Sequence, residues 1–161
     1  MGIESFMKRR VQHYNEKKYW SLRAKVTDPS SKAPRWLKSI WLYKIKKSDA
    51  YNCSSMGTGI GYGAKFEDVP HLPHGLNGIV VSPNAVIGKN CTIFHQVTIG
   101  EGRDGAPTIG DNCFIGVGAK IIGKIRIGDN VRIGANCVVF EDVPDNCTVV
   151  LEKPRYIIRG N

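Results

Sequence analysis

The sequence lacks the segments that mark exported or membrane-spanning chains. No apolar run approaches the roughly 18 residues needed to cross a bilayer, and no basic stretch, apolar core and cleavage site open the chain. Its five cysteines are an odd number without CxxC spacing, a pattern that does not favour a disulfide framework. We therefore expect a cytoplasmic protein.

Acidic residues are few in the first third of the chain. Residues 1–50 contain thirteen Lys and Arg but only four Asp and Glu, so this segment carries +9, the formal net charge of all 161 residues. We expect one helix over about residues 3–25 and another over about residues 34–47. The second helix would gather its large apolar side chains on one face: Trp36, Leu37, Ile40, Trp41 and Ile45.

The sequence leaves the role of this basic segment open. Its amphipathic helices would suit packing against the rest of the protein or against a neighbouring subunit. They would also suit peripheral contact with an anionic membrane, at the inner face for a cytoplasmic protein. No nucleic-acid-binding motif accompanies the charge, so we expect no nucleic-acid partner.

A ladder of β-branched residues organises the rest of the chain. These residues recur every six positions with one interruption, and six of them are followed by glycine. A short fixed period with glycine bends predicts parallel strands that stack coil upon coil in a solenoid. Cys91, Cys113 and Cys137 fall on a second, smaller-residue row and are expected to pack inside. The ladder consists of Val81, Ile87, Ile93, Ile99, Ile109, Ile115, Ile121, Ile127, Ile133 and Val139.

The single interruption of the ladder predicts a projecting loop. Between Ile99 and Ile109 the period lengthens, and residues 101–106 read EGRDGA, which is polar and rich in glycine. The chain thus divides into a basic amphipathic helical segment (1–50), entry turns and a first coil (51–80), the repeats with their loop (81–143), and a C-terminal cap over the last coil (144–161).

Three histidines near the start of the ladder are the candidates for chemistry. His71 and His74 lie three residues apart, and no further ligand with suitable spacing accompanies them, so we expect no metal site. Proton transfer is a better role, because imidazole titrates near neutral pH. His95 is the third candidate.

These residues resemble the hexapeptide-repeat acyltransferases, and within them the serine acetyltransferase-like branch. The resemblance covers about residues 70–144 and is carried by HGLNGIVV at 74–81, QVTIG at 96–100 and IGVGAKI at 115–121. It implies an all-β solenoid, a left-handed parallel β-helix, with a short N-terminal α-helical segment. The left hand is implied by the resemblance alone, because parallel crossovers are ordinarily right-handed.

The resemblance also implies a site. The protein would be a homotrimer, and acetyl-CoA would lie between neighbouring β-helices. His74 would be the general base for direct acetyl transfer to a hydroxyl. His71, His95, Gln96, Arg103 and Asp104 would contact the acceptor. The cofactor candidates border the implied groove or carry positive charge for phosphates: Gly100, Val117, Ala119, Lys120, Arg132, Ala135, Lys153 and Arg155.

Two departures from the serine enzymes concern the acceptor and the catalytic histidine. The serine enzymes have Asp before this histidine and Arg-His-Pro in the loop, whereas this chain has Pro73 and a Gly-Ala-Pro at 105–107. The carboxylate that orients the family's histidine lies where this chain has Gly59, and Glu67 or Asp68 are the nearer substitutes. An amino-acid acceptor would then lack charged partners, which is costly in a partly buried site.

We therefore expect an acetyl-CoA-dependent O-acetyltransferase acting on a sugar or surface-polysaccharide precursor, as in the short polysaccharide O-acetyltransferases that the chain resembles. A serine O-acetyltransferase with a diverged pocket is the first alternative. A non-catalytic β-helix scaffold is the second.

Overall fold

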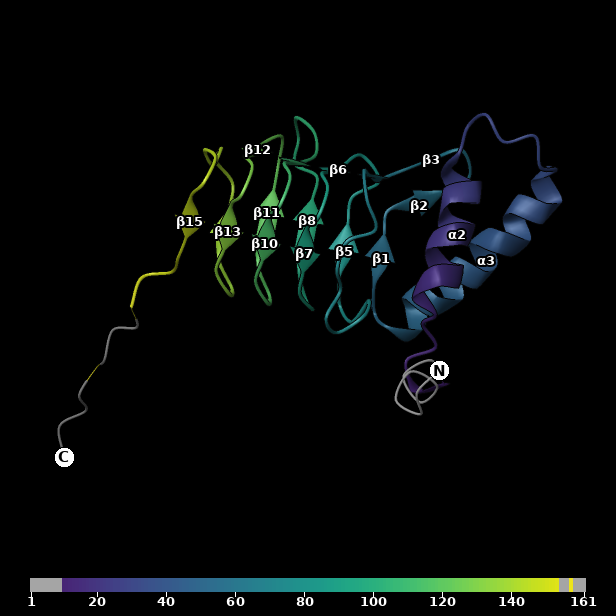
Figure 1. Cartoon of the computed structure of the whole chain (residues 1–161), viewed down its shortest axis with the longest axis horizontal. Helices are drawn as coiled ribbons and strands as arrows, with labels where there is room; N and C mark the ends of the chain where they lie inside the picture. Colours follow the sequence, from purple (N-terminus) through teal and green to yellow (C-terminus); the bar gives the residue numbers. More distant parts are fainter. Residues whose placement is uncertain (1–9, 154–156, 158–161) are drawn as a thin grey trace.

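The computed structural model describes residues 10–153 and residue 157. It is a parallel β-solenoid of about four turns that starts against two helices and runs away from them (Figure 1). The fold class expected from the sequence, a left-handed parallel β-helix with a short helical N-terminal segment, is confirmed.

Three parallel sheets form the faces of the solenoid, and each inner coil contributes one short strand to each face, whereas the first and last coils each meet one face only through an isolated bridge. The five-stranded sheet contains β1 (Ser55–Met56), β5 (Val80–Val81), β8 (Thr98–Gly100), β11 (Lys120–Ile122) and β14 (Val138–Val139). The β7–β15 sheet contains β7 (Thr92–Ile93), β10 (Phe114–Ile115), β13 (Arg132–Ile133) and β15 (Thr148–Val149). The β4–β12 sheet contains β4 (Lys65–Phe66), β6 (Val86–Ile87), β9 (Thr108–Ile109) and β12 (Arg126–Ile127). A separate antiparallel pair joins β2 (Thr58–Gly59) to β3 (Tyr62–Gly63).

The repeat residues form the core between the three faces. All ten ladder residues are at most 6% exposed, and Cys91, Cys113 and Cys137 are each 1% exposed. Each fully buried Ile or Val contributes about 1.5–3 kcal/mol through loss of apolar contact with water. The prediction that the three cysteines pack inside the solenoid is confirmed.

Asparagines with left-handed backbone conformation turn one corner of the solenoid. Asn90, Asn112, Asn130 and Asn146 have φ between +52° and +59°, a region that Asn tolerates better than most residues. The side chains of Asn90 and Asn112 are hydrogen-bonded at 2.9 Å, and those of Asn130 and Asn146 at 3.0 Å. These turns fix the coil-to-coil register.

The helices differ from the predicted ones at their ends. The chain is not helical at residues 12–15, and α2 (Glu16–Thr27) begins only after Asn15, whose side chain accepts a hydrogen bond from the Lys18 N–H. The predicted continuous helix over residues 3–25 is therefore wrong at this point, and residues 1–9 lie outside the described residues. The second helix, α3 (Arg35–Tyr51), extends four residues beyond the predicted end.

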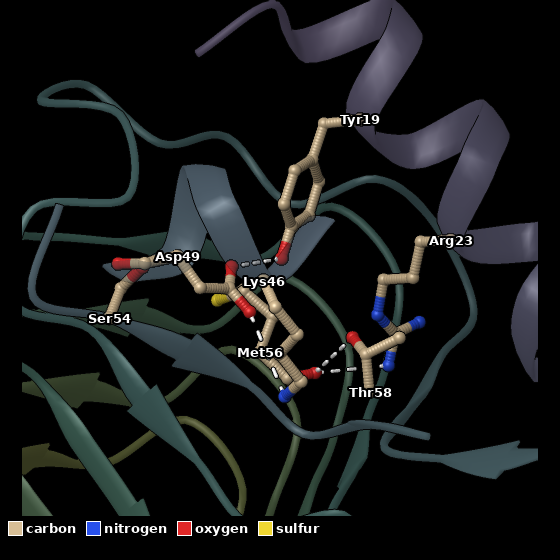
Figure 2. A network of polar contacts seen from close by, with 7 residues as sticks. All are labelled: Tyr19, Arg23, Lys46, Asp49, Ser54, Met56 and Thr58. Carbon is tan, nitrogen blue, oxygen red and sulfur yellow. Dashed lines mark hydrogen bonds and ion pairs between the residues drawn. The ribbon is translucent and has the colours of Figure 1, made fainter. Parts of the chain in front are cut away.

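A buried polar network joins both helices to the first coil (Figure 2). The Tyr19 hydroxyl donates to Asp49 at 2.6 Å, and Lys46 Nζ lies 3.9 Å from the same carboxylate. Arg23 donates to the carbonyl oxygens of Met56 at 3.2 Å and Ala64 at 2.5 Å. Burial raises the pKa of Asp49, raises the pKa of Tyr19 and lowers the pKa of Arg23 to about 10. The inner faces of the two helices thus pack against the solenoid, as one of the two roles considered for this basic segment requires.

The outer face of α3 is apolar and basic. Ile45 is fully buried and Trp41 half-buried, but Trp36 and Tyr43 are 65% and 66% exposed and Ile40 is 43% exposed. The predicted single apolar face is thus split between the interior and the surface. No helix among the described residues is long and apolar enough to span a bilayer. Peripheral membrane contact stays a prediction.

The far end of the solenoid is formed by β15, which pairs with β13. Beyond it, Val150 and Leu151 are 72% and 57% exposed, and the chain leads away from the coils (Figure 1). The cap predicted over residues 144–161 stays a prediction, because most of residues 154–161 lie outside the described part of the chain.

Candidate functional site

A wide turn in the first coil carries His74. It follows a bridge between His71 and Thr92 and leads into β5. Gly75 and Gly78 both have φ of +64° in this turn, and a Cβ at Gly78 would lie 3.1 Å from Cγ of Gln96. The turn therefore depends on glycine, and it leaves the His74 side chain exposed.

Four candidate residues lie along one corner of the solenoid. His71 is aligned with Thr92, Thr92 with Phe114, and Phe114 with Arg132. His95, Val117 and Ala135 follow Thr92, Phe114 and Arg132 by three positions, and backbone hydrogen bonds stack their coils at this corner. The wider turn of the first coil brings His74 to the same line through its ring contact with His95. We call His74, His95, Val117 and Ala135 the corner row. Two imidazoles are thus followed by two small apolar side chains, along the edge between the β7–β15 sheet and the five-stranded sheet.

The two imidazoles of the corner row are in direct contact. The ring centroids of His74 and His95 are 4.6 Å apart, and the ring planes meet at 77° in an edge-to-face arrangement. His95 is half-buried, and its Nδ1 atom is buried with no hydrogen-bond partner among the described residues. The third candidate, His71, is exposed and engages Thr92 and Ile93 through its backbone.

An aromatic path leads away from His74 along the β7–β15 sheet. Phe94 lies 5.9 Å from His74 and 5.0 Å from Phe114, measured between ring centroids. The Arg132 guanidinium lies over the Phe114 ring at 4.8 Å. Sequence reasoning missed both phenylalanines, although each immediately precedes or follows a ladder isoleucine.

The two candidate orienting carboxylates face a different part of the molecule. Glu67 pairs with Lys89 at 3.9 Å, and neither Glu67 nor Asp68 is hydrogen-bonded to His74 among the described residues. Both line a hollow of about 990 Å³ between α2 and the first coils, which none of the candidate histidines lines. Nothing in the described geometry supports a carboxylate partner for His74.

The projecting loop lies at the opposite edge of the five-stranded sheet from His74. It leaves the solenoid after β8 and returns at β9, whereas His74 and His95 precede β5 and β8. Glu101 anchors the loop by accepting hydrogen bonds from Ser82 and Asn84. Arg103 and Asp104 are exposed at its tip. These charged residues and His74 do not meet within one chain.

The remaining cofactor candidates occupy varied positions. Ala119 is fully buried, so its side chain faces the core rather than a groove. Lys120 Nζ donates to the backbone oxygens of Gln96 and Gly118, both at 2.8 Å, and so stabilises the corner that holds His95. Gly100 ends β8, Lys153 is exposed, and Arg155 lies outside the described residues. No group of three or more potential metal ligands occurs in the described part of the chain.

Comparison with known protein families identifies residues 106–141 as matching the family described as bacterial transferase hexapeptide, six repeats. Two similar curated proteins are serine acetyltransferases. The one from Synechococcus elongatus is 42% identical over 108 residues, 65% of this chain and 44% of that protein. The one from Helicobacter pylori is 40% identical over 108 residues, 64% of this chain and 62% of that protein. The chain spans about half the length of the curated relatives it matches.

Solved structures show the same similarity. Neisseria gonorrhoeae serine acetyltransferase in complex with serine matches 95% of this chain and 56% of its own, with 32% identity and a TM-score of 0.59. Entamoeba histolytica serine acetyltransferase 1 in complex with L-cysteine matches 72% of this chain and 47% of its own, with 30% identity and a TM-score of 0.60. A match over 95% of this chain takes in both the β-solenoid and the helical segment.

Proposed function

Because this chain belongs to the hexapeptide-repeat transferase family, in its serine acetyltransferase-like branch, we propose that it is an acetyl-CoA-dependent O-acetyltransferase with His74 as general base. The observation that carries the proposal is the exposed imidazole of His74 at the head of the corner row. A rigid solenoid holds this imidazole on a glycine-dependent turn, as a reacting group requires.

The reaction needs one proton-transfer group and no covalent enzyme intermediate. His74 takes the proton of the acceptor hydroxyl while that oxygen attacks the thioester carbonyl. When the tetrahedral intermediate collapses, the C–S bond breaks and His74 returns the proton to the thiolate of coenzyme A. General acid–base catalysis of this kind contributes about 10²- to 10⁴-fold to the rate.

The corner row also suggests a course for acetyl-CoA. Val117 and Ala135 continue the line of the two histidines with small side chains, so an extended pantetheine arm can lie along the corner toward His74. Arg132 is exposed over Phe114 and lies three positions before Ala135, the last residue of this line. It is the candidate for phosphate contact.

We propose L-serine as the acceptor to test first. The matched relatives are serine acetyltransferases, and the tip of the loop offers one charge of each sign, Arg103 for a carboxylate and Asp104 for an ammonium group. Because the loop and His74 lie at opposite edges of the five-stranded sheet, the loop would have to come from a neighbouring copy. This favours the homotrimer implied by the resemblance over a monomer.

A sugar hydroxyl is the second candidate acceptor, and one observation favours it. Pro73 precedes His74 and no described carboxylate is bonded to this histidine, so the turn itself offers no fixed charge to an amino acid. The sequence alone ranked this acceptor first. The relatives favour serine.

An acceptor panel separates the two candidates. Full-length protein is incubated with acetyl-CoA and either L-serine, L-threonine, sugar nucleotides or polysaccharide fragments, and free thiol release and product mass are measured. We expect thiol release that depends on L-serine, and Arg103→Gln should raise the KM for serine while leaving any turnover of a neutral sugar unchanged. Turnover with sugars alone would select the second candidate, and no turnover with any acceptor would contradict the proposed function.

A further inference from the structure

His95 is a titratable side chain in ring contact with His74, with the two ring centroids 4.6 Å apart. The two imidazoles touch edge to face, and they come from neighbouring coils that the bridge between His71 and Thr92 joins. The backbone of His95 is fixed, because its carbonyl oxygen accepts a hydrogen bond from the Gly118 N–H at 3.1 Å. The contact is therefore built into the corner of the solenoid.

The Nδ1 atom of His95 has an unmet hydrogen-bonding requirement. It is buried and has no partner among the described residues, and a buried polar atom in that state is unfavourable until it finds one. The torsion between Cβ and the ring of a histidine has a broad, soft energy profile. At a centroid separation of 4.6 Å, rotation about this torsion can direct a nitrogen of His74 toward Nδ1 of His95.

A general base works best when its second ring nitrogen is held by a hydrogen-bond acceptor. The acceptor selects the tautomer that presents a lone pair to the substrate, and it stabilises the imidazolium that forms when the proton arrives. Glu67 and Asp68, the two carboxylates expected for this role, line the hollow near α2 instead. The position next to His74 is occupied by an imidazole.

We propose that His95 is the positioning residue of His74, accepting a hydrogen bond from the His74 ring N–H through its own Nδ1. The inference rests on the proposed function for its catalytic consequence, but the pairing itself is a property of the free protein. His95 then carries its proton on Nε2 and keeps it throughout. The acceptor proton travels only from the hydroxyl to His74 and on to the coenzyme A thiolate.

Two substitutions of His95 separate a hydrogen-bonding role from a packing role. His95→Phe keeps a ring of similar shape but has no nitrogen. His95→Asn loses the ring but keeps an acceptor oxygen attached to Cγ, where Nδ1 is attached in histidine. We expect His95→Phe to lower kcat about 10- to 100-fold with the KM for acetyl-CoA unchanged, and His95→Asn to stay within a few-fold of wild type. Equal activity of wild type and His95→Phe would overturn the proposal, as would an equal loss in both variants.

His13→Asn is the matched control. It removes an imidazole that packs on Tyr51 and does not belong to the corner row, and Asn tolerates the φ of +49° at that position. Thermal melts of the three variants should agree with wild type within a few degrees, which excludes unfolding as the cause of a lower kcat.

Nitrogen NMR tests the pairing without any substrate. The 161-residue chain contains four histidines, and single substitutions assign their signals after ¹⁵N-histidine labelling. We expect His95 as the Nε2–H tautomer, His74 in one tautomer, and a shift of His74 toward a tautomer mixture in His95→Phe. A His95 Nδ1–H tautomer, or an unchanged His74 spectrum in His95→Phe, would overturn the proposal. If wild type transfers no acetyl group to any acceptor, the proposed function fails while this measurement still decides the pairing.

Discussion

Replacing Tyr19 by Phe removes the hydroxyl that donates a 2.6 Å hydrogen bond to Asp49. The two side chains are 4% and 2% exposed, so water cannot readily replace the lost donor. A hydrogen bond to a charged group contributes about 1.5–3 kcal/mol, so we expect the free energy of unfolding to fall by about 2 kcal/mol. For a chain of this length that corresponds to a decrease in Tm of about 4–8 °C.

A double-mutant cycle shows whether the loss belongs to this contact. In an Asp49→Asn background the acceptor is neutral, and Tyr19→Phe should then cost only about 1 kcal/mol. Urea denaturation followed by tryptophan fluorescence and circular dichroism measures the four free energies of unfolding at neutral pH. Tyr43→Phe, on the exposed face of α3, is the control and should change stability by less than about 0.5 kcal/mol. A cost for Tyr19→Phe below that of the control, or the same cost in both backgrounds, would refute the reasoning.

Three further predictions concern the buried carboxylate, the turn and the core. Burial raises the pKa of Asp49, so the folded chain keeps a proton that the unfolded chain has released above about pH 4. Wild-type stability should therefore decrease as pH rises through that window, and Asp49→Asn should remove this part of the slope in urea titrations at several pH values. Gly78→Ala should lower both stability and acetyl transfer, because it adds a close contact with Gln96 to the strain of a positive φ. Gly61 also has a positive φ, +80°, but a Cβ added there would have no atom within 4 Å. Gly61→Ala is therefore the control, and in thermal melts it should lower the free energy of unfolding by only about 1–2 kcal/mol. Ile115→Ala, in the central coils, should cost about 2–5 kcal/mol in urea denaturation, with a value below 1 kcal/mol contradicting a close-packed core.

The solenoid could be predicted because its core repeats. Each ladder residue must point inward for the coils to stack, so the period of six in the sequence becomes the row of buried residues from Val81 to Val139. The glycine bends and the three inward cysteines follow from the same constraint. The corner asparagines carried a further signal, since Asn90, Asn112 and Asn130 each follow a ladder residue by three positions.

The helix boundaries and the site were harder to predict. A local cap at Asn15 breaks the first helix, and tertiary contacts with the first coil, not the apolar pattern alone, decide that Asp49 is buried and Trp36 exposed. His74 could be singled out by its motif. Its contact with His95 could not, because the wide turn between His71 and β5 hides the register until the bridge to Thr92 is seen.

His74→Ala tests the central claim most directly. The side chain is exposed on a turn, so its loss should leave the fold and Tm unchanged. Full-length wild type and His74→Ala are compared for L-serine-dependent thiol release from acetyl-CoA, with circular dichroism as the check on folding. We predict a fall in kcat of about 10²- to 10⁴-fold in a folded variant. Unchanged turnover in folded His74→Ala would contradict the assignment of His74 as the general base.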